Sequence, residues 1–271
     1  MKLLTSLTIT IALAALVLAQ TSSSSFSDAA QAKQELNEAA RAYREGRFKE
    51  ALARAEKALL LDPQNKTAPY FIARTMHALY RPGITTPENV AQGHEAIVAY
   101  QRVLKLFPEN DEAYKAIAYL YGALKEDALL TEWLLQRANN VSISNEKRSD
   151  AYVHLASRDW DCSFKITQQP NIKVVTVNGD KTFIQHKMPK ERAEFEQARE
   201  CANRGLEMAN TAILLVPENE SAWTYKSNIL LEFWKLSEMQ GELQQQREFR
   251  RQYEEALRVT TTLSASRKSN P

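Results

Sequence analysis

The sequence predicts an all-α fold built from antiparallel helical hairpins, and three observations support this. The chain of 271 residues has only 7 Gly and 9 Pro, and most of these fall at the expected helix ends. Alanines recur at helical spacing through residues 39–58, where two helices would cross closely. Gly46 provides a turn between these helices. Pro63 ends the second one because proline lacks the N–H that would continue it.

The first predicted hairpin covers about residues 28–65. Its second helix runs from Phe48 to Leu61. This stretch resembles one unit of the tetratricopeptide repeat (TPR) family. Such a unit has Gly or Ala in helix A, Gly and then an aromatic residue at the turn, Ala-Leu at the start of helix B, and Asp-Pro-x-Asn at its end. The resemblance implies a TPR-like right-handed helical-hairpin solenoid of about five pairs over residues 28–260.

The second predicted hairpin begins at Thr67 and contains an insertion. Residues 81–89 break the helical pattern, and the apolar stripe of the next helix resumes at Ala96. Pro63 and Pro108 are 45 residues apart, whereas the family period is about 34. The insertion would project from an edge of the array, either as a ligand contact or as a tolerated decoration.

The third and fourth hairpins match the pattern less regularly. The third pairs a helix around residues 114–122 with one at 128–138. The fourth pairs residues 145–166 with 190–216, and residues 172–185 lie between its two helices.

Residues 172–185 predict a β-hairpin inside the fourth helical pair. β-Branched residues flank Asn178-Gly179, and a turn centred on these two residues requires positive φ at both. Because a two-stranded sheet is not stable alone, the hairpin should pack against the array or a partner.

The fifth hairpin begins at Ser221 and has a polar second helix from Leu243 to Thr260. A terminal repeat needs a polar outer face to stop the stack from growing. Residues 261–271 are expected to form a flexible tail.

The N-terminus predicts export. Lys2 precedes an uncharged, largely apolar run to Ala19, which indicates a signal peptide over residues 1–19 with cleavage near Gln20. The alternative is a permanent anchor helix. Residues 20–27 would then be a Ser-rich, disordered N-terminus of a periplasmic or secreted protein.

The chain has two cysteines, Cys162 and Cys201, which fall on the two helices of the fourth hairpin. In an exported protein the simplest interpretation is a disulfide. It would close a loop of about 40 residues and contribute ~3–4 kcal/mol. The alternative is two free buried thiols. Since there is no Cys-x-x-Cys pattern, the bond is expected to be structural rather than redox-active.

No pattern in the sequence predicts catalysis, a metal site or a cofactor. The formal net charge of +2 does not suggest nucleic-acid or membrane-surface binding. No Gly-x-Ser-x-Gly, P-loop or Gly-x-Gly-x-x-Gly motif occurs. Asp159 and Asp161 are two residues apart and should point to different faces of a helix. The four histidines lack metal-ligand spacing: His77, His94, His154 and His186.

The resemblance implies a concave groove lined mainly by the first helix of each pair. Basic, aromatic and amide groups there suit an extended peptide that carries carboxylates, although a merely solvated face is the alternative. The candidate partner-binding residues are Lys33, Asn37, Arg44, Tyr70, Phe71, Arg74, His77, Lys115, Tyr119, Tyr225 and Asn228.

Some TPR groups clamp the C-terminal carboxylate of a chaperone with Lys, Asn and Arg. This chain has other residues at the matching positions: Leu36, Ala40, Phe71, Glu112 and Ala116. That ligand class is therefore not expected here.

The sequence thus predicts a non-catalytic scaffold that binds a polypeptide or assembly partner on its concave face. One alternative is a self-associating structural subunit of an envelope complex. Another is a small-ligand or accessory protein with a pocket near the inserted hairpin, around Tyr152 and Trp160.

Overall fold

A computed structural model describes residues 27–269 of the chain. The predicted signal peptide and the following residues up to 26 lie outside this part, and Ser27 is already helical. The chain divides into two compact units, which we call unit 1 (to Asp127) and unit 2 (from Ala128). Each unit is described by itself.

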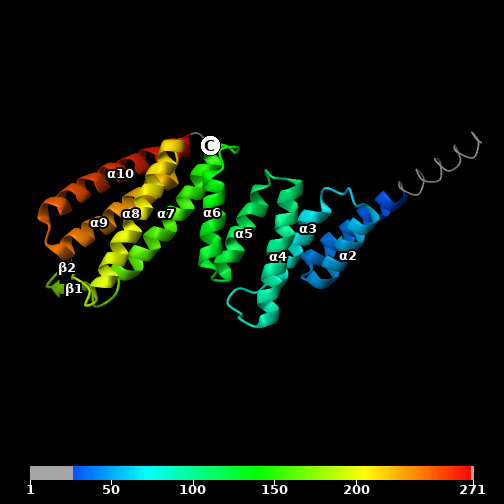
Figure 1. The fold of residues 1–271 in the computed structure, drawn as a ribbon, viewed down its shortest axis with the longest axis horizontal. Helices are drawn as coiled ribbons and strands as arrows, with labels where there is room; N and C mark the ends of the chain where they lie inside the picture. The colour runs from blue at the N-terminus through cyan, green and yellow to red at the C-terminus, as the bar shows by residue number, and fades with distance from the viewer. Residues whose placement is uncertain (1–26, 270–271) are drawn as a thin grey trace, which may run out of the picture. The chain divides into compact units, whose positions relative to one another are not determined.

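Unit 1 is a succession of antiparallel helices, each packed on the next (Figure 1). Residues 27–44 are helical. The following helices are α2 (Phe48–Leu61), α3 (Ala68–Leu79), α4 (Pro87–Leu106) and α5 (Asp111–Ala123). Alanines fill the crossings and are fully buried, among them Ala39, Ala42, Ala51, Ala55, Ala58 and Ala73. The close crossings predicted from the alanine spacing are confirmed.

The predicted insertion at residues 81–89 is shorter than expected because α4 begins at Pro87. Thr86 caps this helix, and proline is well suited to a first turn. The buried side chain of Asn89 orders the loop. It accepts a hydrogen bond from the Arg81 N–H at 2.9 Å and donates to two loop carbonyls at 2.8 and 2.7 Å.

Unit 2 places long helices side by side, with α8 against α7 and α9, and α10 against α9 (Figure 1). Its elements are α6 (Asp127–Asn139), α7 (Asn145–Thr167), β1 (Lys173–Asn178), β2 (Lys181–His186), α8 (Arg192–Leu215), α9 (Glu220–Gln240) and α10 (Leu243–Ser269). The all-α class with one inserted β-hairpin in the fourth pair is confirmed. The two helices of the third predicted pair, α5 and α6, belong mainly to different units.

The β-hairpin is present, but its turn lies one residue later than predicted. Val175 pairs with Ile184 and Asn178 with Lys181, so the two turn residues are Gly179 and Asp180. Gly179 has a φ of +59°, whereas neither Asn178 nor Asp180 has a positive φ. The expected turn with positive φ at both Asn178 and Gly179 is therefore wrong. A turn with glycine at the first central position needs positive φ only there.

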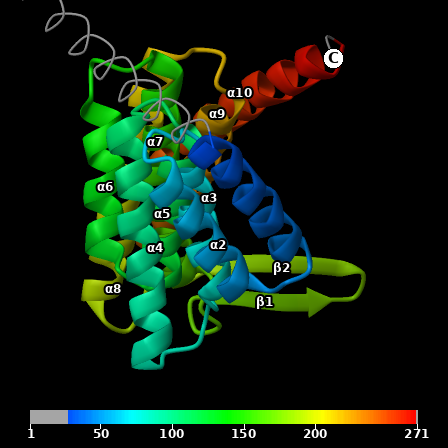
Figure 2. The same cartoon turned by 90° about the vertical axis from the view of Figure 1, so that its right-hand side faces the viewer.

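The hairpin is fastened to unit 2 at its base. The N–H of His186 donates to Glu238 of α9 at 3.1 Å, and the His186 Nδ1 lies 2.7 Å from the same carboxylate oxygen. Ile172 is fully buried beside the first strand. The strands form an arm that extends away from α7 and α8 (Figure 2), and Val177 near its end is 68% exposed. The hairpin thus packs against the helices only through its base.

Helix α10 continues beyond its predicted end at Thr260. It extends to Ser269, so most of the expected flexible tail over residues 261–271 is helical. No Gly or Pro interrupts the chain between Gly241 and Pro271. Threonine hydroxyls also donate to carbonyls four residues earlier, as Thr261 does at 2.9 Å, so these side chains fit within a helix.

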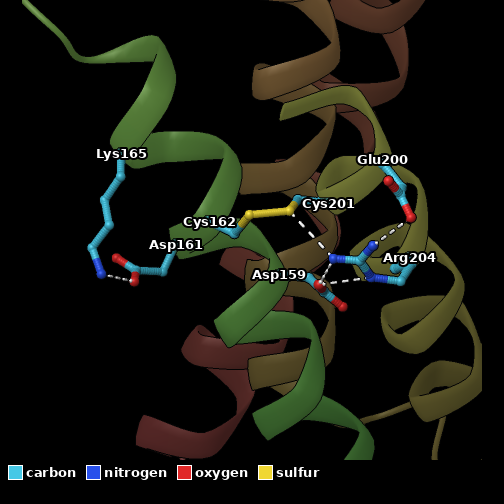
Figure 3. The surroundings of a disulfide bond; sticks show 7 residues. All are labelled: Asp159, Asp161, Cys162, Lys165, Glu200, Cys201 and Arg204. Atoms are coloured by element: carbon cyan, nitrogen blue, oxygen red, sulfur yellow. Dashed lines mark hydrogen bonds and ion pairs between the residues drawn. A yellow bond between two sulfur atoms is a disulfide. The ribbon is translucent and has the colours of Figure 1, made fainter. Parts of the chain in front are cut away.

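The predicted disulfide joins Cys162 of α7 to Cys201 of α8, with Cα atoms 6.0 Å apart. Figure 3 shows the Arg204 guanidinium beside it, donating to Asp159 at 2.9 Å and to Glu200 at 3.0 Å. The same guanidinium lies 3.3 Å from the Cys201 sulfur. Burial raises the pKa of Asp159, although Arg204 opposes this shift. The disulfide and the Arg204–Asp159 ion pair hold together the two helices that the β-hairpin separates in sequence, whereas the Arg204–Glu200 pair lies within α8.

A second polar link lies between α7 and α9, inside the core of unit 2. The Lys235 ammonium donates to Glu232 at 2.6 Å, and the Thr167 hydroxyl donates to the other oxygen of that carboxylate at 2.6 Å. The side chains of Lys235 and Glu232 are only 6% and 1% exposed. The ammonium also lies 5.2 Å from the ring centre of Phe164. Burial of these charges is tolerated because each has partners.

Replacing both Cys162 and Cys201 by Ser should lower the free energy of unfolding by about 3–4 kcal/mol, since the loop of the unfolded chain is no longer closed. Urea unfolding of the variant and of the wild type, each with and without reductant, measures this. The reduced wild type should match the variant. Identical midpoints for the oxidised wild type and the variant would contradict a stabilising bond.

Lys235→Met should cost about 3–5 kcal/mol of unfolding free energy, because it leaves the Glu232 carboxylate buried without its counter-charge. The double variant Glu232→Leu/Lys235→Met should recover much of this loss, because neither charge remains. Chemical denaturation of the three proteins tests the coupling. A double variant as unstable as the single one would show that packing, rather than charge, governs this position.

Candidate functional site

Unit 1 contains a groove with a volume of about 730 Å³. It is bounded by the helix at residues 27–44, by α3 and the loop after it, and by α4 and α5. Its aromatic and charged lining consists of Tyr43, Tyr70, Arg74, His77, Tyr80, Tyr100, Glu112, Lys115 and Tyr119. The lining therefore combines five tyrosines with one histidine, two cations and one carboxylate.

Helix α3 supplies one wall of the groove. Tyr70, Arg74 and His77 are four and three residues apart, so they lie on one face of the helix. The hydroxyl of the buried Thr75 donates to the Phe71 carbonyl at 2.8 Å, so its hydrogen bond is made within the helix. The long polar side chains of α3 are left to project into the groove.

Aromatic contacts connect three helices across the groove. The Tyr100 ring of α4 lies 6.2 Å from Tyr70 and 5.9 Å from His77, both in edge-on geometry. The His77 ring also lies 5.4 Å from Tyr119 of α5. Rings in contact hold one another in fixed rotamers, so the groove is formed before any ligand arrives.

Arg74 is fixed in place by Tyr43. Its guanidinium carbon lies 5.1 Å above the Tyr43 ring, which is a cation–π geometry. A hydrogen bond with the Tyr43 side chain raises the pKa of Arg74 further above its usual range. In the described part of the chain, no carboxylate lies within ion-pairing distance of this guanidinium. Arg74 thus keeps a fixed positive charge that can pair with a ligand anion.

His77 is suited to hydrogen bonding rather than to carrying charge. Burial lowers the pKa of its imidazole, so the ring is neutral at pH 7. Its Nδ1 lies 3.4 Å from the Tyr100 hydroxyl, whose pKa is raised by burial. Among residues 27–269, no cluster of three or more His, Cys, Asp or Glu side chains could hold a metal ion.

Five of the eleven predicted binding residues meet in this groove: Tyr70, Arg74, His77, Lys115 and Tyr119. Lys115 is partly neutralised by an ion pair with Asp111 at 2.6 Å. Arg74 is therefore the better-placed cation.

The other six predicted residues lie elsewhere. Phe71 contacts the Tyr43 ring at 5.7 Å but does not line the groove. Lys33, Asn37 and Arg44 are exposed on the first helix, outside the lining. Tyr225 and Asn228 belong to unit 2, and the Tyr225 ring packs 6.0 Å from Trp160. None of these six side chains therefore lines the groove in unit 1.

Sequence reasoning missed Tyr43, Tyr80, Tyr100 and Glu112. Tyr43 and Tyr100 fit the apolar stripes of their helices, and this pattern predicts core residues rather than a binding site. Their hydroxyl groups could have indicated a polar site, because the hydroxyl of a buried Tyr needs a hydrogen-bond partner. Tyr100 is only 3% exposed and satisfies this need at the floor of the groove.

At the predicted small-ligand pocket, the side chains of Tyr152 and Trp160 contact neighbouring side chains. Trp160 packs against Phe164 at 4.9 Å and against Tyr225, beside the core of unit 2. The Tyr152 hydroxyl donates to Asn139 of α6 at 2.9 Å. These side chains are engaged with their neighbours, so they do not favour this alternative.

The imidazole of His77 should titrate below its unperturbed value of 6.5. Because the unfolded chain then binds the proton more readily, the contribution of His77 to stability is full above about pH 6.5 and is lost as the pH falls below it. NMR titration of the ring, assigned with a His77→Gln variant, measures the pKa. A value at or above 6.5 would contradict the buried, neutral state.

A search with family models finds no match to this sequence, and no curated protein matches it. Solved structures do. MamA from Desulfovibrio magneticus RS-1 is 14% identical over 87% of this chain and 96% of its own, with a TM-score of 0.44. YrrB, described as a TPR protein with an unusual peptide-binding site, is 19% identical over 71% of this chain and 90% of its own, with a TM-score of 0.33.

TTC0263, a TPR protein of Thermus thermophilus, is 17% identical over 74% of this chain and 99% of its own, with a TM-score of 0.32. At such identities and TM-scores, these similarities carry no argument about the site. The arrangement of the helices and strands is an all-α fold of TPR-like helical hairpins with one inserted β-hairpin.

Proposed function

We propose that this chain is a non-catalytic interaction module that binds an extended polypeptide in the groove of unit 1. The observation that carries the proposal is the fixed cation in that groove: Arg74 is held on the Tyr43 ring and has no carboxylate partner in residues 27–269. A cation held in this way next to aromatic rings suits a peptide that carries an acidic side chain.

Different residues of the lining would bind different parts of the peptide. Arg74 pairs with a carboxylate of the peptide through two parallel hydrogen bonds. The rings of Tyr70 and Tyr119 cover a neighbouring apolar side chain, and tyrosine hydroxyls bond its backbone. Because the rings of three helices already hold one another, little ordering cost remains when the peptide binds.

Export to an oxidising compartment belongs to the same proposal. The bond between Cys162 and Cys201 is compatible with the periplasm or with secretion, since cytosolic thiols are kept reduced. Within residues 27–269, no helix is both long and apolar enough to cross a membrane. The polypeptide partner would then be another exported protein.

Selection from a library of random twelve-residue peptides on the purified protein tests the proposal. Selected peptides should be rich in Asp or Glu next to an apolar residue. Arg74→Gln should weaken their binding by at least about tenfold, which corresponds to about 1.4 kcal/mol. Tyr70→Ala should also weaken binding, because it removes a ring from the groove wall.

Arg44→Gln is the matched control, since Arg44 is exposed on the first helix and lies outside the groove. It should change affinity by less than about twofold, which is the size of an ordinary surface effect. Binding that is equally strong in the wild type, Arg74→Gln and Tyr70→Ala would rule out the groove as the peptide site.

A further inference from the structure

A second cavity lies in unit 1 and shares no lining residue with the tyrosine-lined groove. Its volume is about 560 Å³, within the range of about 300–1,000 Å³ that is usual for small-molecule sites. It is formed where α2 ends, α3 begins and α4 ends. Its walls are mainly apolar and include Leu59, Pro69, Ile72, Met76, Leu106 and Phe107.

These apolar side chains are only partly covered by the protein itself. Leu106 is 60% exposed, and Ile72, Met76 and Phe107 are half-buried. An apolar hollow of this kind gains free energy when a hydrophobic group fills it. The flexible thioether of Met76 can adapt to the shape of such a group.

The cavity offers little to the backbone of a peptide. Asn65 is one of its polar side chains, and the Asn65 amide is already used within the loop. Its nitrogen donates to Asp62 at 3.1 Å, and its oxygen accepts from the N–H groups of Thr67 and Ala68 at 3.0 Å each. The Gln64 side chain also lines the cavity, but one amide cannot pair with a whole backbone. An extended peptide would therefore enter with most of its N–H and C=O groups unsatisfied, which is costly, whereas an acyl chain has none.

The charges at the cavity are both positive. Lys66 and Arg102 line it, and no Asp or Glu does. In the described part of the chain, neither cation has a carboxylate within ion-pairing distance. The cavity thus combines an apolar wall with two unneutralised cations, which complements a molecule with an apolar tail and an anionic head.

We propose that this cavity binds the acyl chain of an anionic amphiphile, with the tail along Ile72 and Met76 and the head on Lys66 and Arg102. A long-chain carboxylate and a lipid phosphate share this chemistry. Each CH2 group placed in the cavity should raise the affinity by about fourfold, until the cavity is full.

Isothermal titration of the intact, disulfide-bonded protein tests the proposal. The probes are hexadecanoate, hexadecyl phosphate and the cationic hexadecyltrimethylammonium, each kept below the concentration at which it forms micelles. One equivalent of an anionic probe should bind, and the cationic probe should bind at least about tenfold more weakly because it meets two like charges. The tighter anionic probe identifies the preferred head group.

Two variants locate the site. Lys66→Gln/Arg102→Gln should weaken the anionic probes at least about tenfold, because the head loses both counter-charges. Met76→Trp should weaken all tails, because the larger ring occupies the cavity. The matched control is Lys49→Gln/Lys105→Gln, which removes two exposed lysines of unit 1 that lie outside the cavity. Circular dichroism and thermal unfolding establish that each variant is folded.

Three results would overturn the proposal. The first is the absence of saturable binding by either anionic probe, which would leave the cavity to an apolar side chain of a partner helix. The second is equal binding of the cationic probe. The third is unchanged affinity in both the Lys66→Gln/Arg102→Gln and Met76→Trp variants, which would place the bound amphiphile elsewhere. If Met76→Trp fails to fold, unchanged affinity in the Lys66→Gln/Arg102→Gln variant alone overturns the proposal, because this variant changes only exposed residues.

Discussion

The close crossing of helices through alanine is the constraint on which the rest of unit 1 depends. Ala39, Ala55 and Ala73 have no exposed surface, so neighbouring helices meet over single methyl groups. Such crossings leave no room for large rings between the helices. The rings of Tyr70 and Tyr100 therefore lie beside these crossings and meet edge-on at the groove, with Tyr100 buried at its floor. The candidate site is thus a consequence of how the helices pack, and its aromatic lining would be different if larger side chains separated them.

The helices of unit 2 also cross closely, and two further links hold them together. A Cβ on Gly205 of α8 would come 3.0 Å from the Ile229 side chain of α9 and 3.1 Å from the Asp159 side chain of α7, so glycine allows three helices to approach closely. The disulfide fixes α7 to α8, and the Glu232–Lys235 pair with Thr167 fixes α7 to α9. The disulfide thus holds α7 against α8 although the β-hairpin separates them in sequence.

The sequence was sufficient for the features that depend on local patterns. Alanine spacing, the Asp-Pro stop and the run of β-branched residues predicted the helical pairs and the position of the inserted hairpin. The sequence could not predict features that depend on which of several residues pair or pack together in the folded chain. The hairpin turn lies at Gly179-Asp180 because strand pairing, such as Val175 with Ile184, decides the register. The roles of Tyr43 and Tyr100 were missed because a groove forms only when side chains of separate helices converge.

Helix α3 shows how a short element can line two sites of different chemical character. Tyr70, Arg74 and His77 face the groove, whereas Pro69, Ile72 and Met76 face the apolar cavity, and the two sets alternate along the same turns. Because the period of a helix is 3.6 residues, the two sets lie on different sides of α3. The groove also needs Tyr43 from the first helix, and the cavity needs the end of α2. A shift of α3 would therefore alter both sites, whereas a change at Tyr43 should alter only the groove.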